Sequence, residues 1–157
     1  MKKIILIALL ALTTSCKTTK FTGYANLLTG NVETEKTLEE NYIAANEFMV
    51  ENFNHGESVI QFSDKEAGIV KGKYFMGSYR IVKKGILAGV QNVYCVVTIR
   101  VKDGAAKIEV DGQGAILGHY KDLIFEDGFT NAQYKEKADW LIGRFKSTML
   151  IDDRNKW

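Results

Sequence analysis

In Val93-Tyr-Cys-Val-Val-Thr-Ile-Arg-Val-Lys-Asp-Gly-Ala-Ala-Lys-Ile-Glu-Val-Asp111, apolar residues recur at every second position on both sides of Asp103-Gly104. An Asp-Gly pair between two such runs is a strong signal for a two-residue β-hairpin turn. The pairs that follow, all apolar, are Val101 with Ala106, Ile99 with Ile108, and Val97 with Val110. Turn chemistry and core pattern therefore predict the same register.

A second hairpin is predicted upstream, with its turn at Asp64-Lys-Glu-Ala-Gly68. Pairing Ser63 with Ile69 puts Phe62 opposite Val70 on a face that is mostly apolar. The same register pairs Ile60 with Gly72, Gln61 with Lys71, and Val59 with Lys73. Four antiparallel strands are thus expected between residues 59 and 111.

A helix is predicted before these strands. Thr37 and Glu40 have the spacing of a capping box, and Asn54-His-Gly56 is expected to end the helix. Its apolar face is Leu38, Tyr42, Ala45, Met49 and Phe53. The opposite face carries Glu39, Glu40, Glu47 and Glu51 and is interpreted as a solvated surface.

A second helix is predicted from about Asn131 to Ile151, with Thr130 and Gln133 as its capping box. Its apolar face is Tyr134, Ala138, Leu141, Phe145 and Thr148. An earlier strand is placed loosely between Phe21 and Val32. The order of elements predicts an α+β fold, in which an antiparallel sheet of four to five strands is covered on one face by two helices.

The N-terminus has the features of an export signal. Lys2 and Lys3 precede the apolar run Ile4–Leu12, whose nine residues are too short to span a bilayer, at ~14 Å as a helix against ~30 Å of hydrocarbon. Thr13-Thr-Ser-Cys16 resembles a bacterial lipobox, in which the cysteine is acylated and the chain is cut just before it. Thr13 departs from the usual leucine, and ordinary signal cleavage is the alternative.

This interpretation divides the chain into four parts. Residues 1–15 are a signal peptide, and residues 16–30 are the lipidated Cys16 and a tether with room for the first strand. Residues 31–151 are a single domain, and residues 152–157 are a tail. Loss of Lys2 and Lys3 leaves equal numbers of basic and acidic residues, so the mature chain is neutral. A neutral chain lacks the broad positive field that non-specific nucleic-acid binding needs, and no nucleic-acid partner is predicted.

The expected location is the bacterial cell envelope. Acylated Cys16 would attach the chain to a membrane, and Lys17-Thr-Thr-Lys20 lacks the acidic cluster that accompanies surface export in some lineages. We therefore expect a domain that faces the periplasm. Because Cys16 is assigned to acyl chains, Cys95 has no partner within the chain and no disulfide is predicted.

Several of these segments together resemble one protein family. They are Asn46-Glu-Phe-Met-Val-Glu-Asn-Phe53, Ser58-Val-Ile-Gln61, the turn 64–68, Gly72-Lys73 and Val97-Thr-Ile-Arg-Val-Lys-Asp-Gly104. The chain from about Leu38 to Leu150 is similar to domain-of-unknown-function family 4468, bacterial secreted and lipid-anchored proteins with a TATA-binding-protein-like (TBP-like) fold. The resemblance implies a strand, a helix, four strands and a helix. It implies no activity and no site residues, and a fold alone does not imply DNA binding.

The sequence contains few residues arranged for catalysis. His55 and His119 belong to no metal-binding spacing, and no serine occupies a G-x-S-x-G elbow. Cys95 alternates with Val93 and Val97 on the predicted inner face, which is typical of a buried small hydrophobe rather than a reactive thiol. Asp152-Asp153 is interpreted as solvated. No catalytic residue, metal site or cofactor is therefore predicted.

The candidate binding loop lies between the two hairpins, at Ser78–Val90. It mixes apolar and cationic side chains, and the residues assigned to binding are Tyr79, Arg80, Lys83, Lys84, Ile86 and Leu87. Such a loop could contact a partner protein or anionic lipid headgroups. The alternative is that Tyr79–Val82 extends the preceding strand and Ile86–Val90 begins the next.

These observations favour an envelope lipoprotein that acts as a non-catalytic binding module for an unknown protein or small molecule. One alternative is a small envelope hydrolase with a dispersed site around His55 or His119, because triad members need not be close in sequence. The other is a purely structural lipoprotein. The lack of an acid/base constellation in the sequence favours binding or structure over catalysis.

Overall fold

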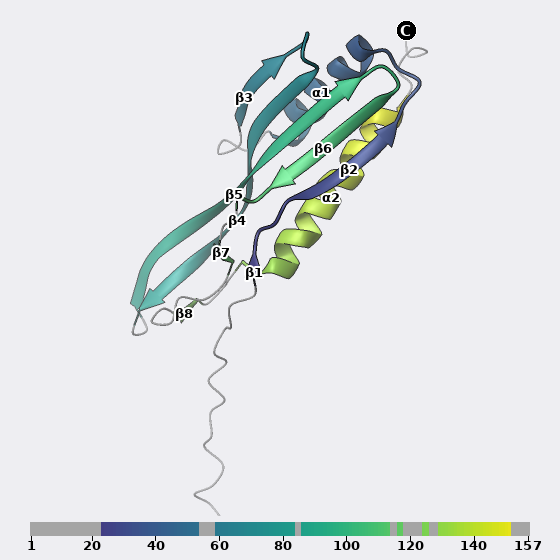
Figure 1. The fold of residues 1–157 in the computed structure, drawn as a ribbon. Coiled ribbons are helices and arrows are strands. Elements are labelled where there is room, and N and C mark those ends of the chain that lie inside the picture. The colour runs from purple at the N-terminus through teal and green to yellow at the C-terminus, as the bar shows by residue number, and fades with distance from the viewer. Residues whose placement is uncertain are drawn as a thin grey trace, which may run out of the picture.

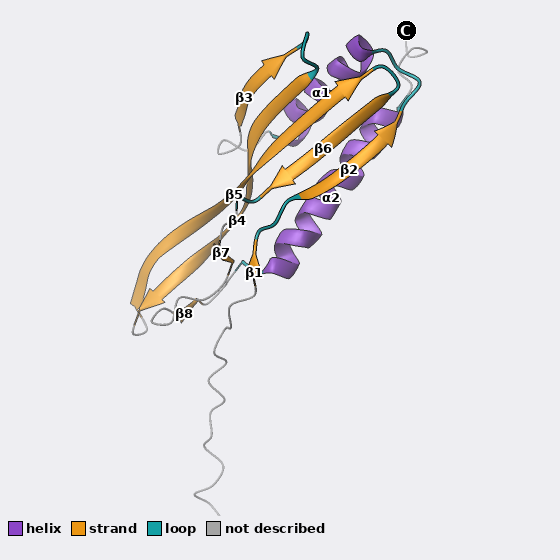
Figure 2. Cartoon of the chain, in the orientation of Figure 1, coloured by secondary structure: helices purple, strands orange, loops and turns teal. Residues whose placement is uncertain are grey.

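The main sheet is antiparallel, and both helices lie on one of its faces (Figures 1 and 2). In the computed structural model of the chain, residues 23–53, 59–83, 86–113, 116–117, 124–125 and 129–151 are described. The elements are β1 (Gly23–Tyr24), β2 (Leu28–Glu33), α1 (Leu38–Asn52), β3 (Val59–Asp64), β4 (Ile69–Lys83), β5 (Ile86–Lys102), β6 (Ala105–Asp111), β7 (Ile116–Leu117), β8 (Ile124–Phe125) and α2 (Asn131–Leu150).

The strand order in the main sheet is β2-β6-β5-β4-β3. The short strand β8 pairs with β4, and β1 pairs with β7. The loosely placed first strand of the sheet is β2, Leu28–Glu33. The predicted α+β fold, a sheet with two helices on one face, is confirmed.

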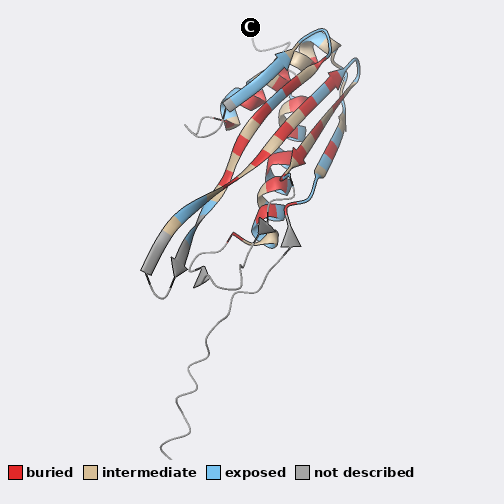
Figure 3. Cartoon of the chain, turned by 60° about the vertical axis from the view of Figure 1, so that its left-hand side comes forward, coloured by how far each residue is buried: buried red, intermediate tan, exposed pale blue. Residues whose placement is uncertain are grey.

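The β5–β6 hairpin has the predicted register. Ile99 lies opposite Ile108, and Val97 lies opposite Val110. All four of these side chains are fully buried. Figure 3 shows in red the buried segments of the sheet and the helices. Gly104 has a φ of 73°, a left-handed conformation that glycine adopts without steric cost. The agreement follows because the turn and the apolar alternation favour the same pairing.

The β3–β4 hairpin differs from its predicted register by a bulge. Val59 pairs with Lys73 and Ile60 with Gly72 as expected, but the register shifts between Ile60 and Phe62. Phe62 consequently pairs with Lys71, on the face away from the helices, and is 50% exposed. The predicted pairing of Phe62 with Val70 is wrong because one extra residue in a strand moves every later side chain to the other face.

Ser63 takes the inward place that the prediction gave to Phe62. It pairs with Val70, which is buried against the helices. The Ser63 hydroxyl contacts the Tyr42 hydroxyl and donates to Asn46 Oδ1 at 3.4 Å. The bulge therefore places a polar contact, rather than an aromatic ring, between β3 and α1.

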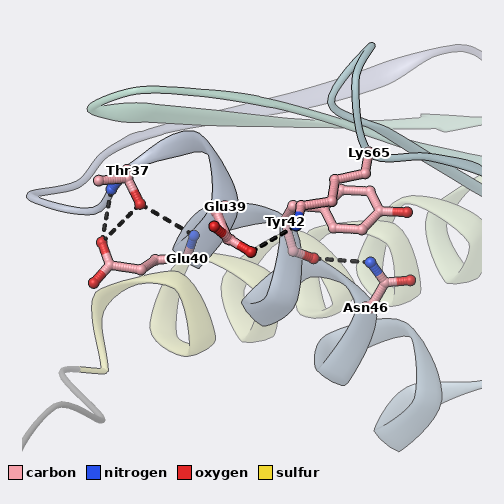
Figure 4. Close-up of polar contacts among 6 residues, drawn as sticks. All are labelled: Thr37, Glu39, Glu40, Tyr42, Asn46 and Lys65. Carbon is pink, nitrogen blue, oxygen red and sulfur yellow. Dashed lines mark hydrogen bonds and ion pairs between the residues drawn. The ribbon is translucent and has the colours of Figure 1, made fainter.

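Helix α1 begins with the predicted capping box. Thr37 Oγ1 accepts from the Glu40 backbone N–H, and Glu40 Oε2 accepts from the Thr37 backbone N–H at 2.8 Å (Figure 4). Ala45, Met49 and Phe53 of the predicted apolar face are buried, whereas Leu38 and Tyr42 are partly exposed. The segment expected to end the helix, 54–56, lies outside the described residues.

The start of α1 is also bound to the β5–β6 turn. Asp103 Oδ1 accepts from the Leu38 backbone N–H at 2.6 Å. Asn41 is completely buried, and its Nδ2 donates to the carbonyls of Lys36 at 3.2 Å and Lys102 at 2.8 Å. These bonds join one end of the sheet to the first turn of the helix.

Helix α2 also has its predicted capping box, at Thr130 and Gln133. Tyr134, Ala138, Leu141 and Phe145 are buried as expected. Thr148 is only partly buried, and Met149 and Ile142 complete the packed face. Phe145 meets Phe48 of α1 edge to face, with ring centroids 5.5 Å apart, so the two helices share one core with the sheet.

The far halves of β4 and β5 continue beyond the helices as a two-stranded arm (Figures 1 and 3). We call residues 77–83 and 86–90 the β4–β5 arm. Its register shifts twice, between Phe75 and Gly77 and between Ile81 and Val82. The first shift lies where Gly77 packs against Phe129, which is the residue just before the cap of α2.

Candidate binding surfaces

The predicted binding residues lie on strands. Tyr79, Arg80 and Lys83 belong to β4, and Ile86 and Leu87 belong to β5. Lys84 lies outside the described residues. The structure thus confirms the strand-extension alternative in place of a loop, because backbone pairing continues to Lys83 and Ile86. Whether these residues bind a partner stays a prediction.

Other predicted positions lie outside the described residues. They are the lipidation site Cys16, the two histidines His55 and His119, and the pair Asp152-Asp153. Within the described ranges, no three His, Cys, Asp or Glu side chains lie where they could hold a metal ion together. No described helix has the length and apolar content needed to cross a membrane.

Cys95 lies in the core, as predicted. It is 1% exposed, and burial raises the pKa of its thiol to about 12. Burial likewise raises the pKa of Tyr134, whose hydroxyl donates to the Asn26 carbonyl at 3.1 Å. Thiolates are the reactive form of cysteine, so Cys95 is suited to packing and not to nucleophilic chemistry.

Lys137 on α2 lies near this part of the core. Burial lowers the pKa of its amine, and Nζ donates to the Met76 carbonyl at 2.7 Å. The same Nζ lies 5.8 Å from the ring centroid of Tyr74 and 5.9 Å from that of Phe75. Lys137 thus satisfies a β4 carbonyl just before the arm, next to the register shift, rather than activating a nucleophile.

The sheet face opposite the helices is not covered by either helix, and we call it the open face. Alternation along β4 places Lys71, Lys73 and Phe75 on it, because Val70, Tyr74 and Met76 face the helices. Lys73 Nζ lies 3.9 Å from the ring centroid of Tyr94 on β5, and Tyr94 meets Phe75 edge to face. Cationic and aromatic side chains therefore lie together on the β4–β5 side of this face.

Charged side chains continue across the open face to β6. Glu109 Oε1 binds Lys107 Nζ at 2.7 Å, and its other oxygen lies 3.9 Å from Arg100 Nε. Beside them is a hollow of about 560 Å³, large enough for a small ligand. Its lining is Asn31, Val32, Glu33, Arg100, Val101, Lys102, Ala105, Ala106 and Lys107.

A second surface lies on the outer side of α1. Ile43 is 50% exposed and Val50 is 65% exposed, one above the other on the helix. A hollow of about 570 Å³ lies along them, lined by Tyr42, Ile43, Asn46, Glu47, Val50 and Glu51. The sequence predicts a charged, solvated surface on this side, but the structure adds an apolar stripe to it. The signal was present as Ile43 and Val50 seven residues apart.

Comparisons with known proteins show similarity in structure. No family model matches the chain, and no curated protein sequence matches it. The crystal structure of a DUF4468 family protein from Bacteroides ovatus ATCC 8483 is 15% identical with a TM-score of 0.52, and covers 81% of this chain and 87% of that chain. A TBP-like protein from Parabacteroides distasonis ATCC 8503 is 14% identical with a TM-score of 0.52, and covers 80% of this chain and 94% of that chain. The resemblance drawn from the sequence is therefore confirmed at the level of the fold.

Proposed function

We propose that this protein is a lipid-anchored binding module of the bacterial envelope, and that it binds its partner without catalysis on the open face of the sheet. The observation that carries the proposal is a broad sheet surface that neither helix covers. It displays cations beside aromatic rings, a combination suited to binding anionic or polar ligands. Acylated Cys16 would supply the location.

The geometry of the open face supports binding rather than chemistry. On its β5–β6 side, Glu109 binds Lys107 and lies near Arg100, so these three charged groups are paired with one another. Its aromatic rings are held in place by Lys73 and by each other. Surfaces with aromatic and arginine side chains held in place are typical of interaction sites.

The β4–β5 arm is the second part of the proposal. Arg80 and Lys83 belong to the β4 strand of the arm, and the apolar residues Ile86 and Leu87 belong to its β5 strand; Lys84 follows Lys83 in the sequence. Because the arm extends beyond the helices, it can reach a partner protein or anionic lipid headgroups. No nucleic acid is included, because the mature chain would be neutral.

The anchor is tested by Cys16→Ser. The variant should stay folded but leave the membrane fraction, because the acyl chains are lost and durable attachment needs more than one chain. Cys95→Ala is the matched control and should remain membrane-bound. Fractionation and mass analysis of the N-terminus decide the question. An unmodified Cys16, or wild-type protein found wholly in the soluble fraction, would contradict the lipid anchor.

The open face is tested by Lys73→Glu combined with Arg100→Glu. Partner recovery from detergent-solubilised envelope should fall, because charges at an interface steer and stabilise the encounter. Lys135→Glu with Arg144→Glu makes the same charge change on the exposed side of α2 and should leave recovery unchanged. Equal recovery by both double variants, measured by quantitative mass spectrometry, would exclude the open face as the binding surface.

A further inference from the structure

We propose that the outer side of α1 is a docking site for a basic amphipathic helix of a partner protein. The site is the stripe of Ile43 and Val50 with Glu47 and Glu51 along one side. It is separate from the open face, since α1 lies against the opposite face of the sheet (Figure 1). The proposal does not depend on lipidation of Cys16.

The apolar part of the site has the spacing of a helix-binding surface. Ile43 and Val50 are i and i+7, and the hollow of about 570 Å³ continues to Tyr42 and Asn46 at i−1 and i+3. Helices that bind in grooves use anchors at i, i+3, i+4 and i+7, so a partner helix would match this stripe along two turns. The two aliphatic side chains are half or more exposed on this helix face and supply the apolar part of the hollow.

The negative charge of α1 favours a basic partner helix. Helix α1 contains four glutamates and no basic residue. Glu40 belongs to the capping box, and Glu39 binds Lys65 Nζ at 2.6 Å (Figure 4). Glu47 and Glu51 have no ion-pair partner among the described residues, and both line the hollow. Lysine or arginine side chains flanking the apolar face of a partner helix would pair with these two carboxylates.

The same charges argue against other occupants. Anionic lipid headgroups would be repelled by Glu47 and Glu51, so a membrane surface is a poor match. A second copy of the chain that used its own α1 would bring four carboxylates together at the contact. The polar side of the hollow is occupied internally, because Tyr42 contacts Ser63 and Asn46 Nδ2 donates to the Tyr42 carbonyl at 2.8 Å.

The experiment uses the Cys16→Ser chain and a synthetic 18-residue peptide of leucine and lysine with helical amphipathic spacing. A scrambled peptide of the same composition is the first control. NMR shift changes should centre on Ile43, Glu47 and Val50, and the scrambled peptide should bind at least tenfold more weakly. Shift changes centred on the open face, or equal binding of the scrambled peptide, would overturn the proposal.

Charge exchange then tests the pairing. Glu47→Lys with Glu51→Lys should weaken binding of the lysine peptide at least tenfold and create binding of a leucine and glutamate peptide. Glu66→Lys with Glu136→Lys makes the same net change at exposed positions away from the stripe and should alter neither affinity more than about twofold. Unchanged affinity in the first variant would contradict the proposal, as would sedimentation showing a dimer that Ile43→Ser dissociates.

Discussion

The two halves of β5 belong to hairpins of opposite character. Toward its end, β5 pairs with β6 without a register shift, and every second side chain there is buried. Toward its start, β5 pairs with β4 in the arm, where the register shifts twice and Val90 is 59% exposed. Both halves contain β-branched residues. The difference teaches that helix cover, rather than strand propensity, decides which half of a strand belongs to the core.

The turns of the two hairpins also differ. The β5–β6 turn is bound to the start of α1: the Gly104 backbone N–H donates to the Lys36 carbonyl, and its own carbonyl accepts from Thr34, both at 2.9 Å. With the Asp103 contact to Leu38, this turn holds helix and sheet together. The arm extends beyond the helices, so substitutions in the arm should affect binding more than they affect stability.

The largest expected effect is the loss of folding when a charge enters the β5–β6 core. Ile99→Asp or Ile108→Asp should unfold the domain, because burial of these side chains is complete. Removing such a side chain costs ~2–5 kcal/mol even as alanine, and an unpaired buried charge costs more. Val90→Asp in the arm should remain folded. Thermal melts compare the three variants, and equal losses would show that helix cover does not separate the two halves.

Glu109→Lys is the outward control for this register. It removes the contacts to Lys107 and Arg100, which should cost at most about 1 kcal/mol. A loss as large as that of Ile108→Asp would place residue 109 on the inner face and contradict the observed pairing.

A smaller effect on stability is expected from substitutions of Gly68 and Gly89. Gly68 has a φ of 63°, and a Cβ there would lie 2.3 Å from the Val101 carbonyl oxygen. Gly68→Ala should therefore lower the free energy of unfolding by roughly 1–3 kcal/mol, the range for a strained backbone position. Gly89→Ala in the arm has open space and should stay within ~0.5 kcal/mol of wild type. Urea unfolding of both measures the contrast, and a neutral Gly68→Ala would contradict the turn geometry.

Alkaline pH should destabilise the domain through groups buried in its core. Burial raises the folded-state pKa of Cys95 to about 12, from an ordinary value of 9.0, and also raises the pKa values of Tyr74 and Tyr134. The unfolded chain therefore loses these protons first, and stability present below pH 9 is lost as pH rises toward 12.

Urea midpoints measured between about pH 8 and 11 test this dependence. Cys95→Ala should flatten the decline, whereas Val90→Asp should not change its slope. An identical slope in wild type and Cys95→Ala would mean that the thiol is not the titrating group.

The smallest effect on stability is expected at the end of the arm. Lys83→Glu with Lys84→Glu should change the free energy of unfolding by less than ~0.5 kcal/mol, as surface charges usually do. Binding to anionic vesicles or to envelope partners should weaken and lose its salt dependence if the arm makes these contacts. Co-sedimentation at low and high salt measures this, and unchanged binding would leave the arm as an extension of the sheet alone.

The sequence predicted some features because local and distant preferences agreed. Asp103-Gly104 and the apolar alternation favour the same pairing of Ile99 with Ile108, and both capping boxes are local patterns that the structure contains. The pairing of Phe62 failed for the opposite reason. Its strand is at the edge of the sheet, and an extra residue there is accommodated by contacts of Ser63 with α1 that alternation along one strand cannot indicate.

By itself, the sequence determined the order of the main elements, the α+β class, the central register and the burial of Cys95, because these depend on spacing and turn chemistry within short segments. The short strands β1, β7 and β8 were not predicted. The tertiary structure alone decided which surfaces remain exposed. Lys73 and Phe75 alternate with Tyr74 and Met76, but this pattern does not indicate which sheet face the helices cover. The stripe of Ile43 and Val50 is recognised as exposed only when the other side of α1 is seen to be packed. Whether a residue is exposed depends on which other residues pack against it, and those residues are distant in the sequence.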